Sequence, residues 1–211
     1  MLESNPNGKV SKVRTATWMM SNLCKGKPGL QLVRPLFPQL VNLLSNEDQE
    51  TMRDACWAFA YISDGDSTNI QSVIETNVVT KIVSMLRNSI YPQVVSPALR
   101  VLGNLVTGDD VQTQHVLDMD ALSVIVPLLG HSKKIVKKEA AWALSNITAG
   151  NSQQIQLVID SGCFSILEET FMTSESDIQK EMTWLIANAT SGGSYAQICS
   201  ILQHNTIQLL L

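Results

Sequence analysis

A nine-residue pattern recurs five times along the 211-residue sequence, and this recurrence constrains the fold more than any other feature. Its clearest copy is WALSNITAG, from Trp142 to Gly150, in which a Trp and an Asn lie four positions apart and a Gly closes the segment. The copies begin at positions 18, 57, 100, 142 and 184, so their spacings are 39, 43, 42 and 42 residues. A period near 40 predicts a repeat protein, in which each unit packs mainly against its neighbours.

The residues between the copies predict the same three helices in each unit. After each Gly come a short helix, a second amphipathic helix and the helix that carries the next copy. HEAT repeats have two helices per unit, whereas one short and two longer helices are typical of armadillo repeats. No run alternates with period two between hairpin turns, so strands are not expected. We therefore expect an all-α fold, an armadillo-repeat right-handed superhelical solenoid of about five three-helix repeats.

The repeat divides the chain into a short leader and an array. We expect a flexible N-terminal segment over residues 1–11 and the armadillo-repeat array over residues 12–211. The last helices of the repeats are expected around 12–25, 51–64, 92–108, 134–150 and 176–192. Solenoids need polar caps at their ends, and this chain stops in the apolar TIQLLL. We therefore expect an array that is truncated at both ends.

Composition and charge exclude several classes of function. Hydrophobic residues make up 45% of the chain and charged residues only 16%, which allows a large core. The formal net charge of −4 argues against a general nucleic-acid-binding protein. No apolar signal segment opens the chain, and no apolar stretch is long enough to span a bilayer. The four cysteines lack disulfide or metal spacing, which favours a reducing compartment, the cytoplasm or the nucleus.

No motif indicates catalysis, a cofactor or a metal site. His115, His131 and His204 are scattered and have no evident Ser or Cys partner. No Gly-rich phosphate-binding loop follows a predicted strand. Cys56 and Cys163 are more typical of small core residues than of nucleophiles. We expect a protein that is not an enzyme and that binds neither cofactor nor metal.

The Trp and Asn of the pattern could belong to the core or to a working surface. A Trp on an apolar helix usually packs inside the protein. In EAAWALSN, however, Ala140, Ala141 and Leu144 can supply the buried face. An Asn is a poor core residue unless its amide is satisfied, and residues four apart share one helix face. We therefore expect Trp142 and Asn146 to form one rung of a row along the concave side of the array.

Regularly spaced indoles, amides and carboxylates suit an extended peptide rich in Lys and Arg. Indole rings form slots whose walls attract the apolar stems and cationic heads of these residues. Asn amides can pair with a peptide backbone without reading its sequence. Carboxylates lie three positions before the Trp in three copies, as Asp54, Glu139 and Glu181. Asp109 and Asp110 follow the copy in which Arg replaces the Trp.

Four ordered strings carry a family resemblance: RDACWA-x-x-Y-x-SDG, VVSPALR-x-x-GN-x-VTG-x-D-x-QTQ, KKEA-x-W-x-x-SNITAGN-x-x-QIQ-x-VID and KE-x-x-W-x-x-ANATSGG. With them the chain resembles importin alpha (karyopherin alpha), the armadillo adaptor that recognises nuclear localisation signals. The resemblance extends from about Lys12 to the end and corresponds to repeats four to eight of ten. It implies a receptor for protein import into the nucleus. The alternative is an armadillo scaffold of another pathway, a cell-junction or signalling adaptor, and such scaffolds generally favour basic grooves.

By position in that family, two groups of residues would bind peptide. The later repeats would form a minor-type groove with Trp142, Asn146, Trp184, Asn188, Glu181, Asn104, Val106, Thr107, Asp110, Glu139, Ser145 and Arg100. The earlier repeats would keep the end of a major-type groove with Trp18, Asn22, Asp54, Trp57 and Tyr61. Arg100 and Tyr61 would lie between the two grooves.

The resemblance also implies partners and a location. Its cargo partners carry Lys/Arg-rich nuclear localisation signals, and the family also binds importin beta through a basic N-terminal segment. No Arg/Lys-rich stretch precedes Lys12, so we expect that segment to be absent here. We expect no direct nucleic-acid partner, no membrane partner, and a location in both cytoplasm and nucleus.

Overall fold

The computed structural model describes residues 6–88 and 91–205, and the regular elements in those ranges are all helices. Five long helices each carry one copy of the pattern: α1 (Pro6–Lys25), α4 (Gln49–Ser63), α7 (Pro92–Leu105), α10 (Lys134–Thr148) and α13 (Ser176–Gly192). Shorter helices connect them or follow the last one: α2 (Leu30–Val33), η1 (Arg34–Leu36), α3 (Phe37–Leu43), α5 (Ser67–Ile74), α6 (Val78–Asn88), α8 (Asp110–Asp118), α9 (Leu122–Ile125), η2 (Val126–Gly130), α11 (Ser152–Asp160), α12 (Cys163–Thr170) and α14 (Tyr195–Leu202). The expectation of an all-α fold is confirmed.

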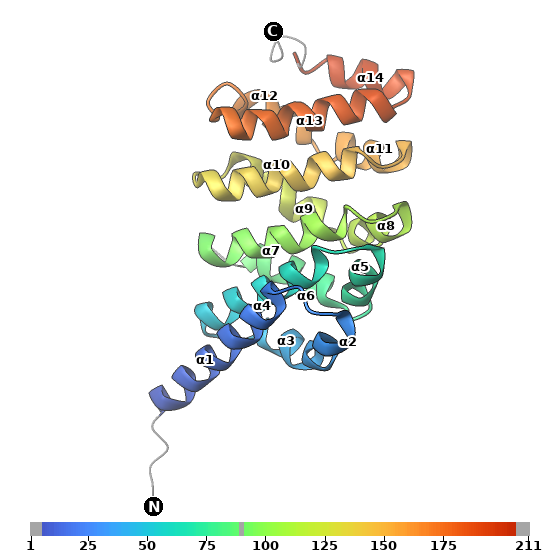
Figure 1. Cartoon of the computed structure of the whole chain (residues 1–211). Coiled ribbons are helices and arrows are strands. Elements are labelled where there is room, and N and C mark those ends of the chain that lie inside the picture. The colour runs from blue at the N-terminus through green and yellow to red at the C-terminus, as the bar shows by residue number, and fades with distance from the viewer. Residues whose placement is uncertain (1–5, 89–90, 206–211) are drawn as a thin grey trace, which may run out of the picture. The chain divides into compact units, whose positions relative to one another are not determined.

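The chain divides into two compact units, residues 1–101 and residues 102–211, with the boundary inside α7. In the first unit the long helices α1 and α4 pack along each other. In the second unit α10 and α13 do the same, and Figure 1 shows them side by side with α11 and α14 at one end. Among the helices described, none is both long and apolar enough to cross a membrane.

Each long helix of the second unit buries one face and leaves another accessible. On α10 the residues that spacing predicts to be core, Ala140, Ala141 and Leu144, are fully buried. Trp142 and Asn146 lie on a different stripe and are half-buried. The helix is thus fixed against its neighbours by small and aliphatic side chains, which leaves the Trp/Asn stripe at the surface.

Local sequence sets where the short helices begin. Three of them open with a capping box. In this motif the side chain of the N-cap residue accepts a hydrogen bond from the backbone N–H three residues on, and the Gln at that position accepts one from the N–H of the N-cap residue. The pairs are Asp109 with Gln112, Asn151 with Gln154, and Ser194 with Gln197. Because the boxes recur at the same point of three successive repeats, α8, α11 and α14 begin in the same way.

The N-terminus differs from the expected flexible segment over residues 1–11. Helix α1 already begins at Pro6, so residues 6–11 are helical, and residues 1–5 lie outside the described ranges. Proline is favoured at the first position of a helix because its missing N–H has no partner there in any case. The fixed backbone angle of Pro6 therefore suits the observed start.

Candidate functional site

The Asn residues of the second unit reach back to the preceding repeat. Asn146 Nδ2 donates to the Gly103 carbonyl at 3.4 Å, and Asn188 Nδ2 donates to the Ser145 carbonyl at 2.9 Å. Gly103 and Ser145 are each 43 residues upstream of their partner, so the two contacts are equivalent. Each contact fixes the carboxamide in one orientation and uses one N–H. The oxygen and the second N–H are left for a further partner.

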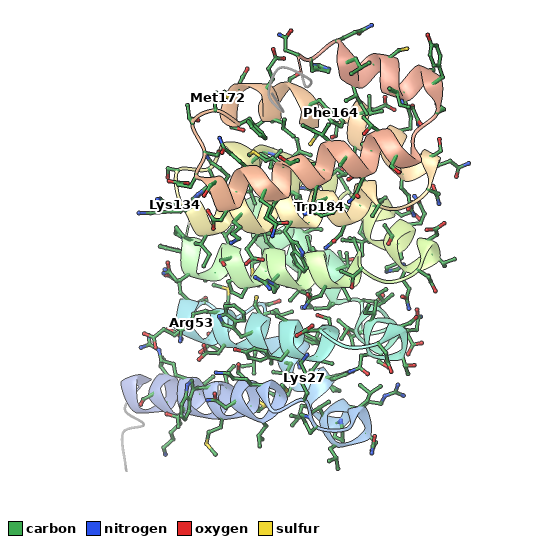
Figure 2. The ribbon with its side chains drawn as sticks, turned by 45° about the horizontal axis from the view of Figure 1, so that its top comes forward. Lys27, Arg53, Lys134, Phe164, Met172 and Trp184 are labelled. Carbon is green, nitrogen blue, oxygen red and sulfur yellow. The ribbon has the colours of Figure 1, made fainter. Side chains whose placement is uncertain are left out.

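Trp184 is the most open indole of this unit. It is 54% exposed on α13, one turn before Asn188, and Figure 2 shows it midway along that helix. A single exposed aromatic residue is common on protein surfaces and is not in itself a binding site. The exposed indole of Trp184 therefore lies one turn from the Asn188 amide, whose orientation is fixed.

Trp142 is held more tightly, because its ring lies against Gly103 of α7. A Cβ added at Gly103 would stand 2.7 Å from Cε3 of this indole and closer still to Cζ3. Such approaches are not possible without movement of a rigid ring. Gly103 therefore contacts both members of the rung, the indole through its open Cα and Asn146 through its carbonyl.

A hollow of about 310 Å³ in the second unit brings together several of the expected residues. It is lined by Val106, Thr107, Gly108, Asp110, Thr113, Asn146, Ala149 and Gly150. The Asp110 carboxylate is exposed and accepts a hydrogen bond from Asn151 Nδ2 at 3.1 Å. The hollow thus combines an amide, a hydroxyl and a carboxylate, groups that can bind a backbone and a cation.

Other expected residues of the later repeats have less access. Val106, Asn104 and Ser145 have buried side chains. The Ser145 hydroxyl donates to the Trp142 carbonyl at 2.8 Å, and its own carbonyl holds Asn188. These residues can support the rungs from within.

The two carboxylates expected beside the rungs differ in burial. Glu139 is buried, whereas Glu181 is half-buried on α13. Lys138 Nζ lies 2.7 Å from Asp177, and that hydrogen bond raises the pKa of Lys138, with attraction from Glu181 and Glu139 adding to it. Glu181 is therefore the carboxylate of the pair that an outside cation can approach.

The first unit contains the expected residues of the earlier repeats. Trp18 is 57% exposed, and Asn22 Nδ2 donates to the Trp18 carbonyl at 3.0 Å, within its own helix. Trp57 and Tyr61 stack with ring centroids 5.7 Å apart and planes at 23°. The Tyr that replaces Asn in this copy therefore covers one side of its own Trp. Arg100, on α7, is half-buried.

Asp54 lies beside this stack and already has a cationic partner. Its side chain is 9% exposed, and Arg53 Nε donates to Asp54 Oδ1 at 2.8 Å. Sequence spacing places Asp54 next to Trp57 but gives no sign of this pairing.

Two of the buried cysteines are poor nucleophiles. Burial raises the pKa of the Cys56 thiol strongly and that of the Cys163 thiol to about 12. Both thiols are neutral near pH 7, and the thiolate is the reactive form. Within residues 6–88 and 91–205, no three His, Cys, Asp or Glu side chains gather in a way that could hold a metal ion.

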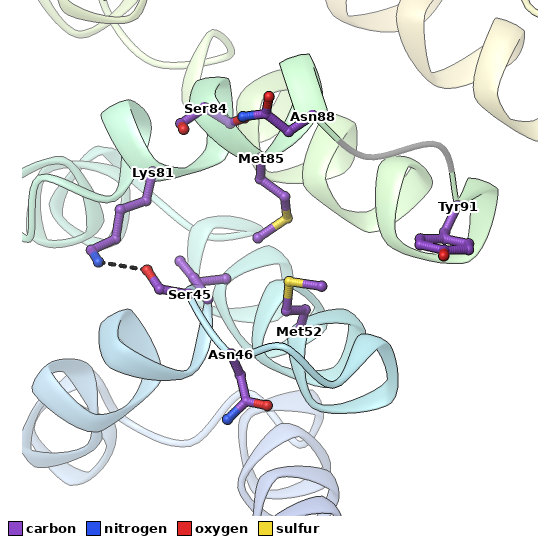
Figure 3. A pocket seen from close by; sticks show the side chains of 9 residues that line it. Ser45, Asn46, Met52, Lys81, Ser84, Met85, Asn88 and Tyr91 are labelled. Atoms are coloured by element: carbon purple, nitrogen blue, oxygen red, sulfur yellow. Dashed lines mark hydrogen bonds between the residues drawn. The ribbon is translucent and has the colours of Figure 1, made fainter.

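A second hollow, in the first unit, has a different character (Figure 3). Its volume is about 340 Å³, and Met52 and Met85 line it together with polar residues of the turn after α3, of α6 and of the turn before α7. Lys81 Nζ donates to Ser45 Oγ at 2.8 Å across its rim. It contains none of the residues expected from the sequence pattern.

The sequence model of the armadillo/beta-catenin-like repeat matches residues 31–64, 109–149 and 151–191, more than half of the chain. The chain therefore belongs to the armadillo/beta-catenin-like repeat family. A designed armadillo repeat protein solved in complex with the peptide (KR)4 is similar in structure. It has a TM-score of 0.84 at 29% sequence identity, over 99% of this chain and 87% of that protein. The expectation of an armadillo fold is confirmed.

Among curated proteins, importin alpha subunits are similar in sequence. Importin subunit alpha-3 of Arabidopsis thaliana is 48% identical over 141 residues, which are 65% of this chain and 26% of that protein. Importin subunit alpha-1a of Oryza sativa subsp. japonica is 46% identical over 145 residues, 67% of this chain and 27% of that protein. The chain thus spans about a quarter of the length of these relatives, and the resemblance to importin alpha is confirmed.

Sequence reasoning missed two residues beside the expected site, Gly103, which contacts Trp142 and Asn146, and Arg53, which pairs with Asp54. Gly103 was visible as a helical glycine three positions after Arg100, and an unexplained glycine inside a helix indicates a close approach. Arg53 gave no comparable signal. The carboxylate with which Arg53 pairs depends on whether the next long helix begins with an acidic residue.

Proposed function

We propose that this chain is a nuclear import signal receptor, an adaptor that binds Lys/Arg-rich nuclear localisation signals in extended form along its Trp/Asn rows. The repeated rung carries the proposal, because Asn146 and Asn188 are fixed in the same way on the preceding repeat. Rungs that repeat with one geometry match a ligand whose backbone also repeats. The likeness to importin alpha subunits supports the same function.

The second unit supplies complementary chemistry for such a peptide. Trp184 offers an apolar wall for a Lys or Arg stem, and Asn188 offers its free amide atoms to the peptide backbone. Glu181 and Asp110 are accessible carboxylates for the cationic heads. The designed armadillo protein in complex with (KR)4 shares this fold, which is a further reason to propose Lys/Arg-rich ligands.

The proposed partners follow from the same site and family. Cargo proteins that carry Lys/Arg-rich signals are the proposed ligands of the rows. Importin beta is not among the partners proposed for these residues, because the family binds it through a basic N-terminal segment and no Arg/Lys-rich stretch precedes Lys12. Both cytoplasm and nucleus are the proposed locations.

Fluorescence anisotropy with a labelled peptide of alternating Lys and Arg tests the proposal. Replacing Trp184 and Asn188 by Ala removes one whole rung. Because Trp184 is more than half exposed, this change leaves no large cavity. We expect affinity to fall by about 1–3 kcal/mol, the scale of interface anchors.

Met172→Ala is a matched control, since Met172 is also an exposed apolar residue of the second unit but lies outside the rungs. It should leave the affinity unchanged. An equal-length peptide of Glu and Asp should not bind. Unchanged affinity in the rung variant would refute the groove assignment, and preference for the acidic peptide would favour an armadillo scaffold of another pathway.

A further inference from the structure

A basic residue lies one turn before the Trp in each copy of the pattern that has a Trp. These residues, four positions upstream on the same helix face, are Arg14, Arg53, Lys138 and Lys180. A cation in this position stands near the carboxylates expected to receive a cationic peptide. Whether this basic residue competes with the peptide for those carboxylates therefore depends on which residue of the chain it pairs with.

In two repeats the cation is held by the next repeat. Arg14 Nε donates to Asp48 Oδ1 at 3.0 Å, and Lys138 Nζ donates to Asp177 Oδ2 at 2.7 Å. Asp48 is the N-cap of α4 and Asp177 lies in the first turn of α13. Both acceptors thus belong to the start of the following long helix, where a negative charge is also favoured by the helix dipole.

Arg53 has no such acceptor ahead of it. The sequence contains no carboxylate from position 76 to position 108, so the start of α7 offers none. Gln93 in the first turn of α7 lines the same hollow as Arg53 and donates to Gln49 Oε1 at 3.1 Å. Arg53 turns back on its own helix and pairs with Asp54 at 2.8 Å.

We infer that Arg53 is an intramolecular competitor for the Asp54 carboxylate and weakens the binding of Lys/Arg side chains beside Trp57. This inference rests on the function proposed above. Arg53 is one turn from Trp57 on the same face of α4, and its side chain is 34% exposed. Its guanidinium must therefore leave before a peptide cation can reach Asp54. In the first unit, a Lys or Arg of the peptide is therefore disfavoured at the position beside Trp57 and Asp54.

The environment of Arg53 keeps the guanidinium in place. The hydrogen bond that Arg53 donates to Asp54 raises the pKa of the guanidinium, and attraction from Glu50 and Asp48 adds to this effect. An arginine is ionised at every physiological pH. Competition at Asp54 is therefore permanent rather than switched by pH.

The test uses the Trp184→Ala, Asn188→Ala chain, in which the second unit binds the peptide more weakly, so that the change in affinity on further substitution at Arg53 or Asp54 is measured against a smaller background. Arg53→Gln should tighten binding about two- to fivefold, the range of an exposed ion pair. Arg14→Gln removes the same charge but releases Asp48, and it should give a smaller gain. Asp54→Asn should abolish the gain in the Arg53→Gln chain, while in the presence of Arg53 it should change affinity little.

Gln93→Glu is a second test that leaves both Arg53 and Asp54 intact. It supplies the missing carboxylate at the start of α7, as Asp48 and Asp177 do in the other repeats. It should also tighten binding, and Asp54→Asn should again remove the gain. Additive effects of Arg53→Gln and Asp54→Asn would overturn the competition. If the unmodified chain binds peptide but Arg53→Gln has no effect, only this inference fails, whereas loss of binding in every chain overturns the proposed function as well.

Discussion

Gly103 positions Trp142 through the Cβ atom that it lacks. On helix propensity alone, Gly103→Ala should stabilise α7 by about 1 kcal/mol. In this structure the new methyl group would clash with the six-membered ring of the Trp142 indole, which is rigid and has to move. We expect the substitution to lower the free energy of unfolding instead, and to shift the fluorescence of Trp142 to longer wavelength as the ring becomes more exposed. Denaturant unfolding and emission spectra measure both.

Gly130→Ala is the control for this prediction. Gly130 is a glycine of the same unit at which an added Cβ meets nothing within 4 Å. It should leave both the stability and the emission spectrum nearly unchanged. A stabilised Gly103→Ala protein with an unchanged spectrum would show that the ring has room.

Residue types and spacing predicted which side chains share a face, but not how firmly each is held. The four-residue interval correctly placed Trp142 and Asn146 on one stripe, apart from the buried Ala140 and Ala141. It could not predict that Asn146 bonds to a carbonyl 43 residues upstream. That contact depends on the separation and rotation of two helices, which a one-dimensional period does not contain.

At the scale of helices, Gln154 joins a capping box to the preceding repeat. Its Oε1 accepts from the Asn151 N–H at 3.2 Å, and its Nε2 donates to the Asp110 carbonyl at 2.8 Å. Gln154→Leu keeps the size but removes both hydrogen bonds of a fully buried side chain. We expect a loss of about 2 kcal/mol in the free energy of unfolding. The exposed neighbour Gln153, changed to Leu, should cost little by the same measurement.

The contact between α1 and α4 should make stability depend on acidic pH. The hydrogen bond from Arg14 lowers the pKa of Asp48 from 3.8 to about 2, so ionised Asp48 favours the folded state. This contribution is complete above about pH 5 and is lost as pH falls through the folded pKa near 2. Asp48→Asn should therefore reduce stability at pH 7, and the difference from the parent should vanish towards pH 2.

Asn retains the ability of Asp48 to cap α4, where the side chain accepts from the Thr51 N–H at 3.0 Å. Asp48→Ala removes the cap as well and should cost about 1 kcal/mol more at every pH. Thermal unfolding of the three proteins between pH 2 and pH 7 separates the charge from the cap. A difference between Asp48→Asn and the parent that does not change with pH would contradict the assignment.

At the scale of the whole chain, the period predicted the architecture because each repeat packs mainly on its neighbours. One unit of about 40 residues, read five times, was enough to predict an all-α armadillo fold. The same reasoning fails where repeats differ. Arg14 and Arg53 occupy equivalent positions, yet one pairs with the next repeat and the other with its own helix, because only one of them has a carboxylate ahead. Function that resides in such differences has to be found in the structure.

The charge balance of the whole chain bears on how a cationic peptide should bind. The sequence has 19 acidic and 15 basic residues, and several of the acids are already paired with cations of the chain. Attraction for the Lys/Arg peptide then comes from accessible carboxylates near the rungs, such as Asp110 and Glu181, and from the net charge of −4. Raising salt from about 0.1 M to about 1 M shortens the screening length from about 10 Å to about 3 Å. We expect the affinity to fall about tenfold, or about 1.4 kcal/mol.

A peptide with half of its Lys and Arg changed to Gln should show a shallower salt dependence, because the indole and amide contacts do not depend on charge. Equal slopes for the two peptides would mean that the carboxylates contribute nothing to recognition.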